Sequence, residues 1–261
     1  MTVANPYQAD PTRIGLGHCF DQQIWEETVQ VIRDGGISQH DVIENFMLFL
    51  RRVNFAKFLT HMELFKHTIT LPGSIVECGV FKGMSLLTFA KLMEIYCPGD
   101  TLKRVIGFDT FSGFVSLDPS DGLPDTRRGK VAGGWNSGQF KPSLEQLISI
   151  TKRDSMIPRF HRVELVEGDV SKTVPEYVAA NPGLRISLLH LDLDLYQPTL
   201  DALRALYPLV VSGGVILLDE YGMEGFPGET KAFDEYFAGK RPKLTKFPFI
   251  STPGGYFIKD E

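Results

Sequence analysis

Two stretches decide how this chain is interpreted: LLHLDLDLYQPT, residues 188–199, and VILLDEYG, residues 215–222. Each begins with a short apolar run, which is typical of a strand buried on both faces of a parallel sheet. The first run ends in Asp192 and Asp194, and the second ends in Asp219 and Glu220. Because the carboxyl ends of neighbouring parallel strands meet at one edge of a sheet, we expect these acids to lie close together.

Carboxylates gathered in this way repel one another unless a positive charge lies between them. A hard divalent cation accepts oxygen ligands and leaves positions for substrate oxygens and water. The paired acids therefore predict a divalent-metal site, with Mg²⁺ as the ion. Acids at strand ends also act as helix N-caps or join ion pairs, and that interpretation stays open. His190 lies within the apolar run, so we interpret it as a core histidine with one hydrogen bond, outside the site.

The surrounding segments predict an α/β fold. Short apolar strands alternate with amphipathic helices, which indicates a mainly parallel sheet with helices on both faces. The expected strands cover residues 74–79, 104–109, 163–168, 186–192 and 214–219. The expected helices between them cover residues 84–96, 143–152, 174–180 and 199–209. An antiparallel hairpin is expected at the sheet edge, with arms at 244–250 and 255–258, which completes a seven-stranded sheet.

The residues before this pattern predict an N-terminal extension. Residues 1–21 have no periodicity and indicate an irregular arm, whereas residues 22–33 and 38–68 carry apolar side chains at helical spacing. We interpret these helices as packed on the main domain, with a ligand-binding role or a dimer contact as alternatives. Their apolar face predicts a homo-oligomer. The predicted domains are therefore 1–70 and 71–261.

One long connection interrupts the regular alternation. Residues 110–142 hold many Gly, Asp and Ser residues together with Trp135. Connections of this length are usually functional loops or disordered segments. We predict a lid or binding loop, and a disordered excursion is the alternative.

The bulk composition limits the class of protein. The chain has 261 residues, of which 43% are hydrophobic, and a formal net charge of -5. It is long enough for one enzyme-sized core, and it lacks the long basic run that binding nucleic acid requires. It also has neither an apolar run long enough to cross a bilayer nor a signal-like N-terminus. Cys19, Cys78 and Cys97 include no CxxC pair, so they predict neither a disulfide framework nor a zinc site. We expect a soluble, cytoplasmic protein that acts on a small molecule.

The first expected strand leads into a glycine-containing turn, ECGVFKGMS, residues 77–85. Glycines in such a turn let a ligand approach the backbone, and N–H groups at the helix start bind a carboxylate such as that of an amino acid. Glu77 is placed to stabilise an ammonium or sulfonium cation. Glycines at such a turn also serve tight packing, and the dinucleotide fingerprint G-x-G-x-x-G is absent, so both interpretations stay open.

Acids also end the second and third expected strands. Asp109 is placed to accept hydrogen bonds from the two hydroxyls of a ribose, and residues 110–113 form a compact loop beside it. Asp169 is placed to accept a hydrogen bond from an amino group such as that of adenine. Either acid is also placed to cap the helix that follows. Their joint spacing favours an adenosine pocket.

The chain resembles the macrocin O-methyltransferase family, whose members methylate deoxysugars in bacterial antibiotic biosynthesis. The similar segments are ECGVFKGMS (77–85), GFDTFSGF (107–114), GDV (168–170), HLDLDLYQPTLDAL (190–203) and GGVILLDEYG (213–222). The likeness covers about residues 71–261. Its most specific parts are D-x-D-L-Y-x-P-T and G-G-x-x-x-x-D-[DE]-Y. Within the family, the chain is most similar to members that act on a nucleotide-linked rhamnose in enediyne pathways.

The resemblance implies a Rossmann-like class I methyltransferase fold, S-adenosylmethionine as methyl donor, Mg²⁺, and a deoxysugar acceptor that is linked to a nucleotide or to a natural product. It implies that Asp192 is the general base and that Asp194, Asp219 and Glu220 bind the metal. Which of Asp192 and Asp194 is the base stays open. The implied cofactor-binding residues are Glu77, Gly79, Phe81, Gly83, Ser85, Asp109, Thr110, Ser112, Gly168, Asp169 and Val170. Leu193 stands where many relatives have Gly, and Glu220 replaces a second Asp. The longer Glu keeps the oxygen ligation but alters the coordination geometry.

Other functions are weighed against this one. A metal-dependent nucleotide-sugar glycosyltransferase explains Asp192 and Asp194 but leaves Glu77, Asp109 and the Asp219–Glu220 pair without a role. A phosphatase with an Asp nucleophile normally carries its D-x-D after the first strand of the core. A noncatalytic binding protein on a methyltransferase scaffold has no need of both acidic pairs.

Overall fold

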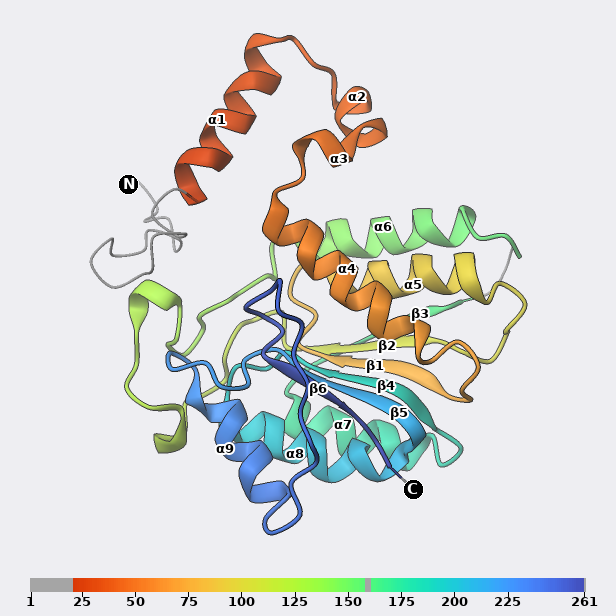
Figure 1. The fold of residues 1–261 in the computed structure, drawn as a ribbon, viewed down its shortest axis with the longest axis vertical. Helices are drawn as coiled ribbons and strands as arrows, with labels where there is room; N and C mark the ends of the chain where they lie inside the picture. The colour runs from red at the N-terminus through yellow and green to blue at the C-terminus, as the bar shows by residue number, and fades with distance from the viewer. Residues whose placement is uncertain (1–20, 158–160, 261) are drawn as a thin grey trace.

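The computed structural model describes residues 21–157 and 161–260. In these residues the strands form one sheet of six, in the order β3-β2-β1-β4-β5-β6 (Figure 1). The strands are β1 (Ser74–Cys78), β2 (Val105–Asp109), β3 (Val163–Glu167), β4 (Ile186–Leu191), β5 (Val210–Leu218) and β6 (Gly255–Ile258). The first five pair in parallel, and β6 runs antiparallel to β5. The predicted mainly parallel α/β fold is confirmed.

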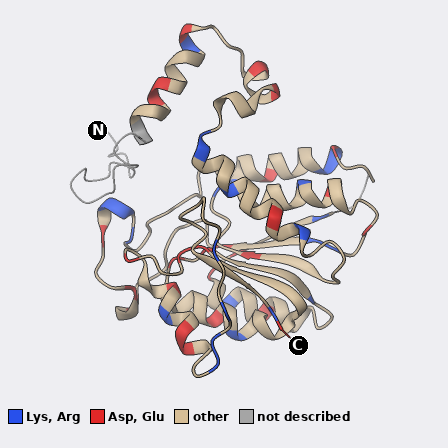
Figure 2. Ribbon diagram, in the orientation of Figure 1, with Lys and Arg blue, Asp and Glu red and all other residues tan. Residues whose placement is uncertain are grey.

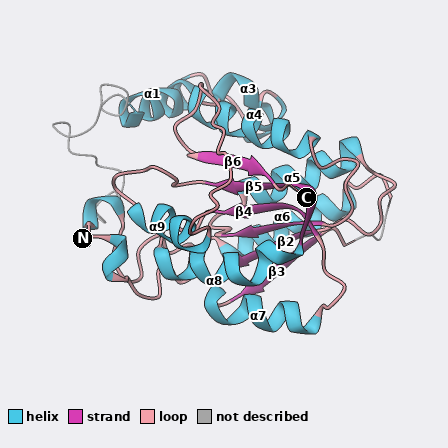
Figure 3. Cartoon of the chain, turned by 60° about the horizontal axis from the view of Figure 1, so that its bottom comes forward, coloured by secondary structure: helices cyan, strands magenta, loops and turns pink. Residues whose placement is uncertain are grey.

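Helices cover both faces of the sheet (Figures 1 and 3). On one face lie α4 (Arg52–Lys66), α5 (Met84–Tyr96) and α6 (Lys141–Arg153), and on the other lie α7 (Val170–Ala180), α8 (Tyr196–Leu206) and α9 (Pro227–Tyr236). Successive residues of a strand point to opposite faces, so Leu188 packs in one apolar cluster and Leu189 in the other. This double burial explains why the strands are continuous apolar runs. The helix after β5, α9, was not predicted.

The C-terminal segment returns antiparallel as predicted, but the sheet has one strand fewer than the seven expected. Leu218 pairs with Gly255, where β6 begins. Residues 244–250, expected as the first hairpin arm, contribute only an isolated bridge between Thr245 and Tyr256. The next hydrogen-bonded pair of this ladder would join Phe247 and Gly254, but the Gly254 N–H donates to the Asp219 carbonyl at 2.8 Å, so the pairing stops. The seven-strand prediction is therefore wrong.

The N-terminal extension is broken into several helices. α1 (Asp21–Asp34), α2 (Gln39–Glu44) and α3 (Phe46–Phe49) come before α4 and stand away from the sheet in Figure 1. Ile43, on α2, is 75% exposed, whereas Leu64 and Phe65 of α4 are fully buried. The predicted packing against the main domain therefore holds for α4. The irregular arm expected at residues 1–21 lies outside the described residues except for Asp21, where α1 begins.

Residues 110–142 connect β2 to α6 with turns of their own. They include the 3-10 turns η1 (Pro119–Asp121) and η2 (Thr126–Arg128) and a bridge between Asp125 and Lys130. The Trp135 indole N–H donates to the Arg128 carbonyl at 3.0 Å.

A third 3-10 turn, η3 (Tyr207–Leu209), follows α8. In the described part of the chain, no helix combines the length and the apolar character that crossing a membrane requires.

Candidate active site

A cavity of about 660 Å³ opens at the carboxyl ends of the parallel strands. This volume lies within the range of ~300–1,000 Å³ that is usual for small-molecule sites. The predicted site residues that line it are Gly79, Phe81, Asp109, Thr110, Asp169, Val170, Asp192, Asp194, Asp219 and Glu220. β1 and β4 lie side by side at the centre of the sheet, although they are distant in the sequence, and this reversal of strand order leaves a crevice between their ends. Figure 2 shows acidic residues gathered where the central strands end.

The turn after β1 requires its glycines for close packing. Gly79 has φ +96°, and a Cβ built there would lie 1.7 Å from the Asp192 carbonyl oxygen. Gly83 has φ +81°, and a Cβ there would lie 2.4 Å from a Leu144 methyl carbon. Only glycine meets both requirements at these positions. Gly79 also lines the cavity, whereas Gly83 does not, so for Gly83 the structure supports the packing interpretation.

Glu77 and Ser85 lie beneath the turn rather than at the cavity wall, contrary to the sequence prediction. Glu77 is fully buried. It accepts a hydrogen bond from the Ser85 hydroxyl, and its Oε1 lies 3.1 Å from Nδ1 of His190. The side chains of β1 alternate between the two faces of the sheet, and this alternation turns Glu77 toward the core under α4 and α5. Its charge is therefore directed at His190.

Asp109 and Asp169 line the cavity as expected. Asp109 accepts hydrogen bonds from the backbone N–H groups of Phe81 at 2.7 Å and Phe111 at 2.6 Å, and burial raises its pKa. Asp169 caps α7 by accepting from Ser171 N–H at 3.1 Å. Asp169 therefore does cap the following helix, which the sequence left open, and it also lines the cavity.

Ser112 and Gly168 are predicted cofactor residues that do not line the cavity. Ser112 is exposed, and its N–H donates to Thr110 Oγ1 at 3.2 Å. Gly168 has φ +139°, and its N–H donates to the Asp109 carbonyl at 2.9 Å. Both residues therefore support the loops that carry Asp109 and Asp169.

The acids that follow β4 and β5 do gather, as predicted. Carboxylate oxygens of Asp192, Asp194 and Glu220 lie within 4.8 Å of one another. Asp219 is 3% exposed and Glu220 5%. A further acid, Glu229 of α9, is fully buried, and its Oε1 accepts from Glu220 N–H at 2.9 Å. We call these residues, Asp192, Asp194, Asp219, Glu220 and Glu229, the carboxylate cluster.

Burial and mutual repulsion act on the acids of the carboxylate cluster. Burial raises the pKa of Asp194 to about 8, and the neighbouring Asp192 carboxylate adds to the effect. Burial and Asp194 likewise raise the pKa of Glu220. Oε2 of Glu220 and Oε2 of Glu229 are buried and accept no hydrogen bond. This buried, all-oxygen donor set fits a hard divalent cation.

Lys57 brings an ammonium group from α4 into the carboxylate cluster. Its Nζ lies 3.2 Å from Asp219 Oδ2 and 3.6 Å from Asp192 Oδ2. Burial disfavours the charged lysine, but attraction to Asp219 and Asp192 outweighs it and holds the pKa of Lys57 above its ordinary value. Burial likewise works against the Asp219 carboxylate, and the Lys57 charge outweighs it and lowers the pKa of Asp219. The sequence prediction missed Lys57, because a lysine in an amphipathic helix usually faces solvent.

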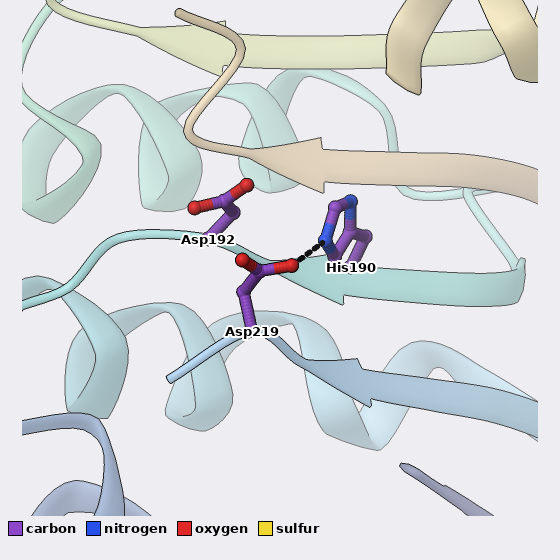
Figure 4. A group of neighbouring side chains, drawn as sticks. All are labelled: His190, Asp192 and Asp219. Carbon is purple, nitrogen blue, oxygen red and sulfur yellow. Dashed lines mark ion pairs between the residues drawn. The ribbon is translucent and has the colours of Figure 1, made fainter. Parts of the chain in front are cut away.

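His190 lies between two carboxylates, as Figure 4 shows for Asp219. The imidazole is fully buried, with Nδ1 at 3.1 Å from Glu77 Oε1 and Nε2 at 3.5 Å from Asp219 Oδ1. Burial opposes the imidazolium, but Asp219 and Glu77 raise the pKa of His190 to about 10. His190 is thus a core histidine, but it contacts two acids where one hydrogen bond was expected. It connects the turn after β1 to the carboxylate cluster.

Comparison with known proteins identifies a family. The macrocin O-methyltransferase (TylF) model matches residues 51–243. Two relatives are the 8-demethyl-8-(2,3-dimethoxy-alpha-L-rhamnosyl)-tetracenomycin-C 4'-O-methyltransferase of Streptomyces olivaceus and the mycinamicin III 3''-O-methyltransferase of Micromonospora griseorubida. The first is 28% identical over 59% of this chain and 55% of its own length. The second is 23% identical over 90% of this chain and 84% of its own. The match thus spans about half the length of the Streptomyces enzyme.

Two solved structures of CalS11, a calicheamicin methyltransferase, have the same fold. One superposes with a TM-score of 0.86 at 29% identity and covers 96% of each chain. The other, an apo structure of CalS11 as a TDP-rhamnose 3'-O-methyltransferase, has a TM-score of 0.78 at 28% identity and covers 96% of this chain and 99% of CalS11. This agreement confirms the predicted class I methyltransferase fold. The family match starts at residue 51, so it includes α4 and Lys57.

We predict that His190→Ala destabilises the protein. The change leaves Glu77 and Asp219 as buried carboxylates with one cationic partner fewer, and breaking a buried pair typically costs about 3–5 kcal/mol. We expect the free energy of unfolding, measured by urea denaturation, to fall by about 3 kcal/mol. His40→Ala on α2 is the control, because that side chain is 79% exposed. Equal stability of the two variants would contradict a charged His190 network.

Proposed function

Because the chain belongs to the macrocin O-methyltransferase family, we propose that it transfers the methyl group of S-adenosylmethionine to a hydroxyl of a sugar in antibiotic biosynthesis. One observation carries this proposal: the turn after β1, the acid that ends β2 and four acids of the carboxylate cluster, all but Glu229, line the same cavity. The acceptor is a deoxysugar, linked to a nucleotide or attached to a natural product. The names of the relatives support this class, since they refer to a rhamnosyl-tetracenomycin, to mycinamicin III and to TDP-rhamnose.

The methyl donor is assigned to the side of the cavity formed by β1, β2 and β3. The residues assigned to it are Gly79, Phe81, Asp109, Thr110, Asp169 and Val170. Two backbone N–H groups hold the Asp109 carboxylate in place, which leaves it ready to accept from ribose hydroxyls. Bound S-adenosylmethionine supplies a methyl group on a positively charged sulfur. The negative acids around the cavity stabilise the positive charge on the sulfur. Transfer of the methyl group to the acceptor oxygen removes that charge.

Asp192 is assigned as the general base. Its side chain lines the cavity and is 26% exposed, so it is open to an acceptor hydroxyl. As the new oxygen–carbon bond forms and the carbon–sulfur bond breaks, the hydroxyl proton passes to the Asp192 carboxylate. The sulfur leaves as a neutral thioether. General-base catalysis of this kind typically contributes about 10²- to 10⁴-fold in rate.

Asp194, Asp219 and Glu220 are assigned to Mg²⁺, with Asp192 beside them. When bound, a divalent ion supplies a Lewis acid that lowers the pKa of a sugar hydroxyl and aligns neighbouring oxygens. The unpaired, buried Oε2 of Glu220 supports the assignment. Glu229 lies behind Glu220 and accepts a hydrogen bond from the Glu220 backbone N–H. This bond fixes the backbone position from which the Glu220 side chain extends. Glu220 is one methylene longer than Asp, and Glu229 is the residue that positions it.

We predict that Asp192→Asn lowers turnover by at least about a hundredfold, because the amide does not accept the hydroxyl proton. The affinity for S-adenosylhomocysteine, measured by calorimetry, should change little. Turnover is measured by mass spectrometry of products from isotopically labelled S-adenosylmethionine, magnesium and a panel of nucleotide deoxysugars and glycosylated natural products. Asp154→Asn, at the C-terminus of α6, is the charge-matched control. Turnover near that of the control would remove Asp192 from the base role.

Removal of divalent metal tests the metal assignment. After dialysis against EDTA we expect at least about a hundredfold loss of turnover, because positioning and acidification of the hydroxyl both depend on the ion. Added Mg²⁺ should restore the rate, and S-adenosylhomocysteine should bind with or without the ion. Full turnover of the metal-free protein would exclude a metal-assisted mechanism.

A further inference from the structure

We propose that Lys57 is an internal competitor of the divalent cation, and that its ammonium group sets how tightly the carboxylate cluster binds the ion. The inference rests on the metal site proposed above. Lys57 reaches acids from two different strand ends, Asp192 after β4 and Asp219 after β5. Asp219 is one of the ligands assigned to the ion, and Asp192 lies beside the assigned ligands.

Asp219 has a basic side chain near each of its two carboxylate oxygens. Its Oδ2 lies 3.2 Å from the Lys57 ammonium, and its Oδ1 lies 3.5 Å from His190 Nε2. An ion that takes Asp219 Oδ2 as a ligand must therefore share that oxygen with the Lys57 ammonium or displace the ammonium. Lys57 is the mobile one of the two, because its flexible side chain is 23% exposed whereas His190 is fully buried within β4.

The remaining acids form a group that lacks sufficient positive charge. Oxygens of Asp192, Asp194 and Glu220 lie within 4.8 Å of one another. Among the ion pairs of residues 21–157 and 161–260, this group has one basic partner, Lys57, at 3.6 Å from Asp192 Oδ2. A divalent ion at this group shares Asp192 with the ammonium. Two cations at such a spacing repel strongly where water is mostly excluded.

The position of Lys57 on α4 favours a built-in role over a chance surface contact. The buried side of α4 includes Ala56, Thr60, His61 and Leu64, and Lys57 lies one turn before His61. Lys57 is therefore at the edge of the buried face, with its aliphatic chain directed to the cavity that it lines. In the metal-free protein the ammonium offsets part of the repulsion among the acids. A bound metal ion has to displace the ammonium or share the acids with it.

The test is Mn²⁺ binding to purified full-length protein by isothermal titration calorimetry, without donor or acceptor. Lys57→Met keeps most of the side-chain volume and removes the charge, so we expect Mn²⁺ to bind at least about tenfold more tightly, equivalent to about 1.4 kcal/mol. Lys57→Arg retains the charge and should stay within about threefold of the wild-type affinity. Lys66→Met is the matched control on the same helix, because Lys66 is exposed and pairs only locally with Glu63.

Thermal unfolding gives a second readout that does not depend on activity. The Lys57→Met variant should unfold at a lower temperature than the wild type without metal, and Mn²⁺ should raise its midpoint by more than it raises that of the wild type. If Lys57→Met does not fold, Lys57→Gln replaces it, since the amide keeps a hydrogen-bond donor without the charge.

The outcomes separate this inference from the proposed function. Mn²⁺ binding that is unchanged or weaker in a folded Lys57→Met variant overturns the competition and leaves the metal site intact. Binding to the variant but not to the wild type supports the competition and contradicts a metal-dependent reaction. Absence of Mn²⁺ binding to both proteins overturns the inference and the metal assignment together.

Discussion

Mutual repulsion among the carboxylates at the ends of β4 and β5 is the constraint on which the rest of the structure depends. The apolar strands bring Asp192, Asp194, Asp219 and Glu220 together, and burial makes their charge costly. Lys57 and His190 offset part of that charge, and each comes from an element with its own packing role. The acidic edge of the sheet therefore links α4, β1 and β5 into one arrangement around the cavity.

This arrangement joins the two sides of the proposed reaction. Glu77 lies under the turn that carries Gly79, and through His190 it is connected to Asp219 in the carboxylate cluster. The low local dielectric strengthens the interactions along this series of buried groups. The helix α4 has a similar role, since it supplies both the core residue Phe65 and the ammonium of Lys57.

Much of the fold could be predicted because its strands are buried on both faces. Segments such as 186–192 are continuous apolar runs, and their order with the helices specifies a parallel sheet. The missing seventh strand shows the limit of that argument, since residues 244–250 have strand-like composition but form only one isolated bridge, because the Gly254 N–H bonds to Asp219 instead. The helix α9 escaped prediction because it buries few apolar residues, among them Ala232 and Phe233, and buries Glu229 as well.

The candidate site was predictable where topology alone places residues. Acids at the ends of adjacent parallel strands meet whatever the details of packing, so the gathering of Asp192, Asp194 and Glu220 followed from the pattern. Lys57 and Glu229 come from helices whose docking is decided by tertiary contacts, and no local signal distinguishes them from solvent-facing charges. Glu77 was placed at the cavity because it ends a strand. The register beside His190 instead directs it into the core.

Crystallographic location of the ion tests the central claim most directly. We expect crystals soaked with Mn²⁺ to show an anomalous difference peak about 2.0–2.6 Å from carboxylate oxygens of Asp194 and Glu220. The Lys57 ammonium should lie farther from Asp192 Oδ2 than the 3.6 Å of the present structure. An empty cluster in crystals that bind Mn²⁺ elsewhere, with Lys57 unmoved, would contradict the account.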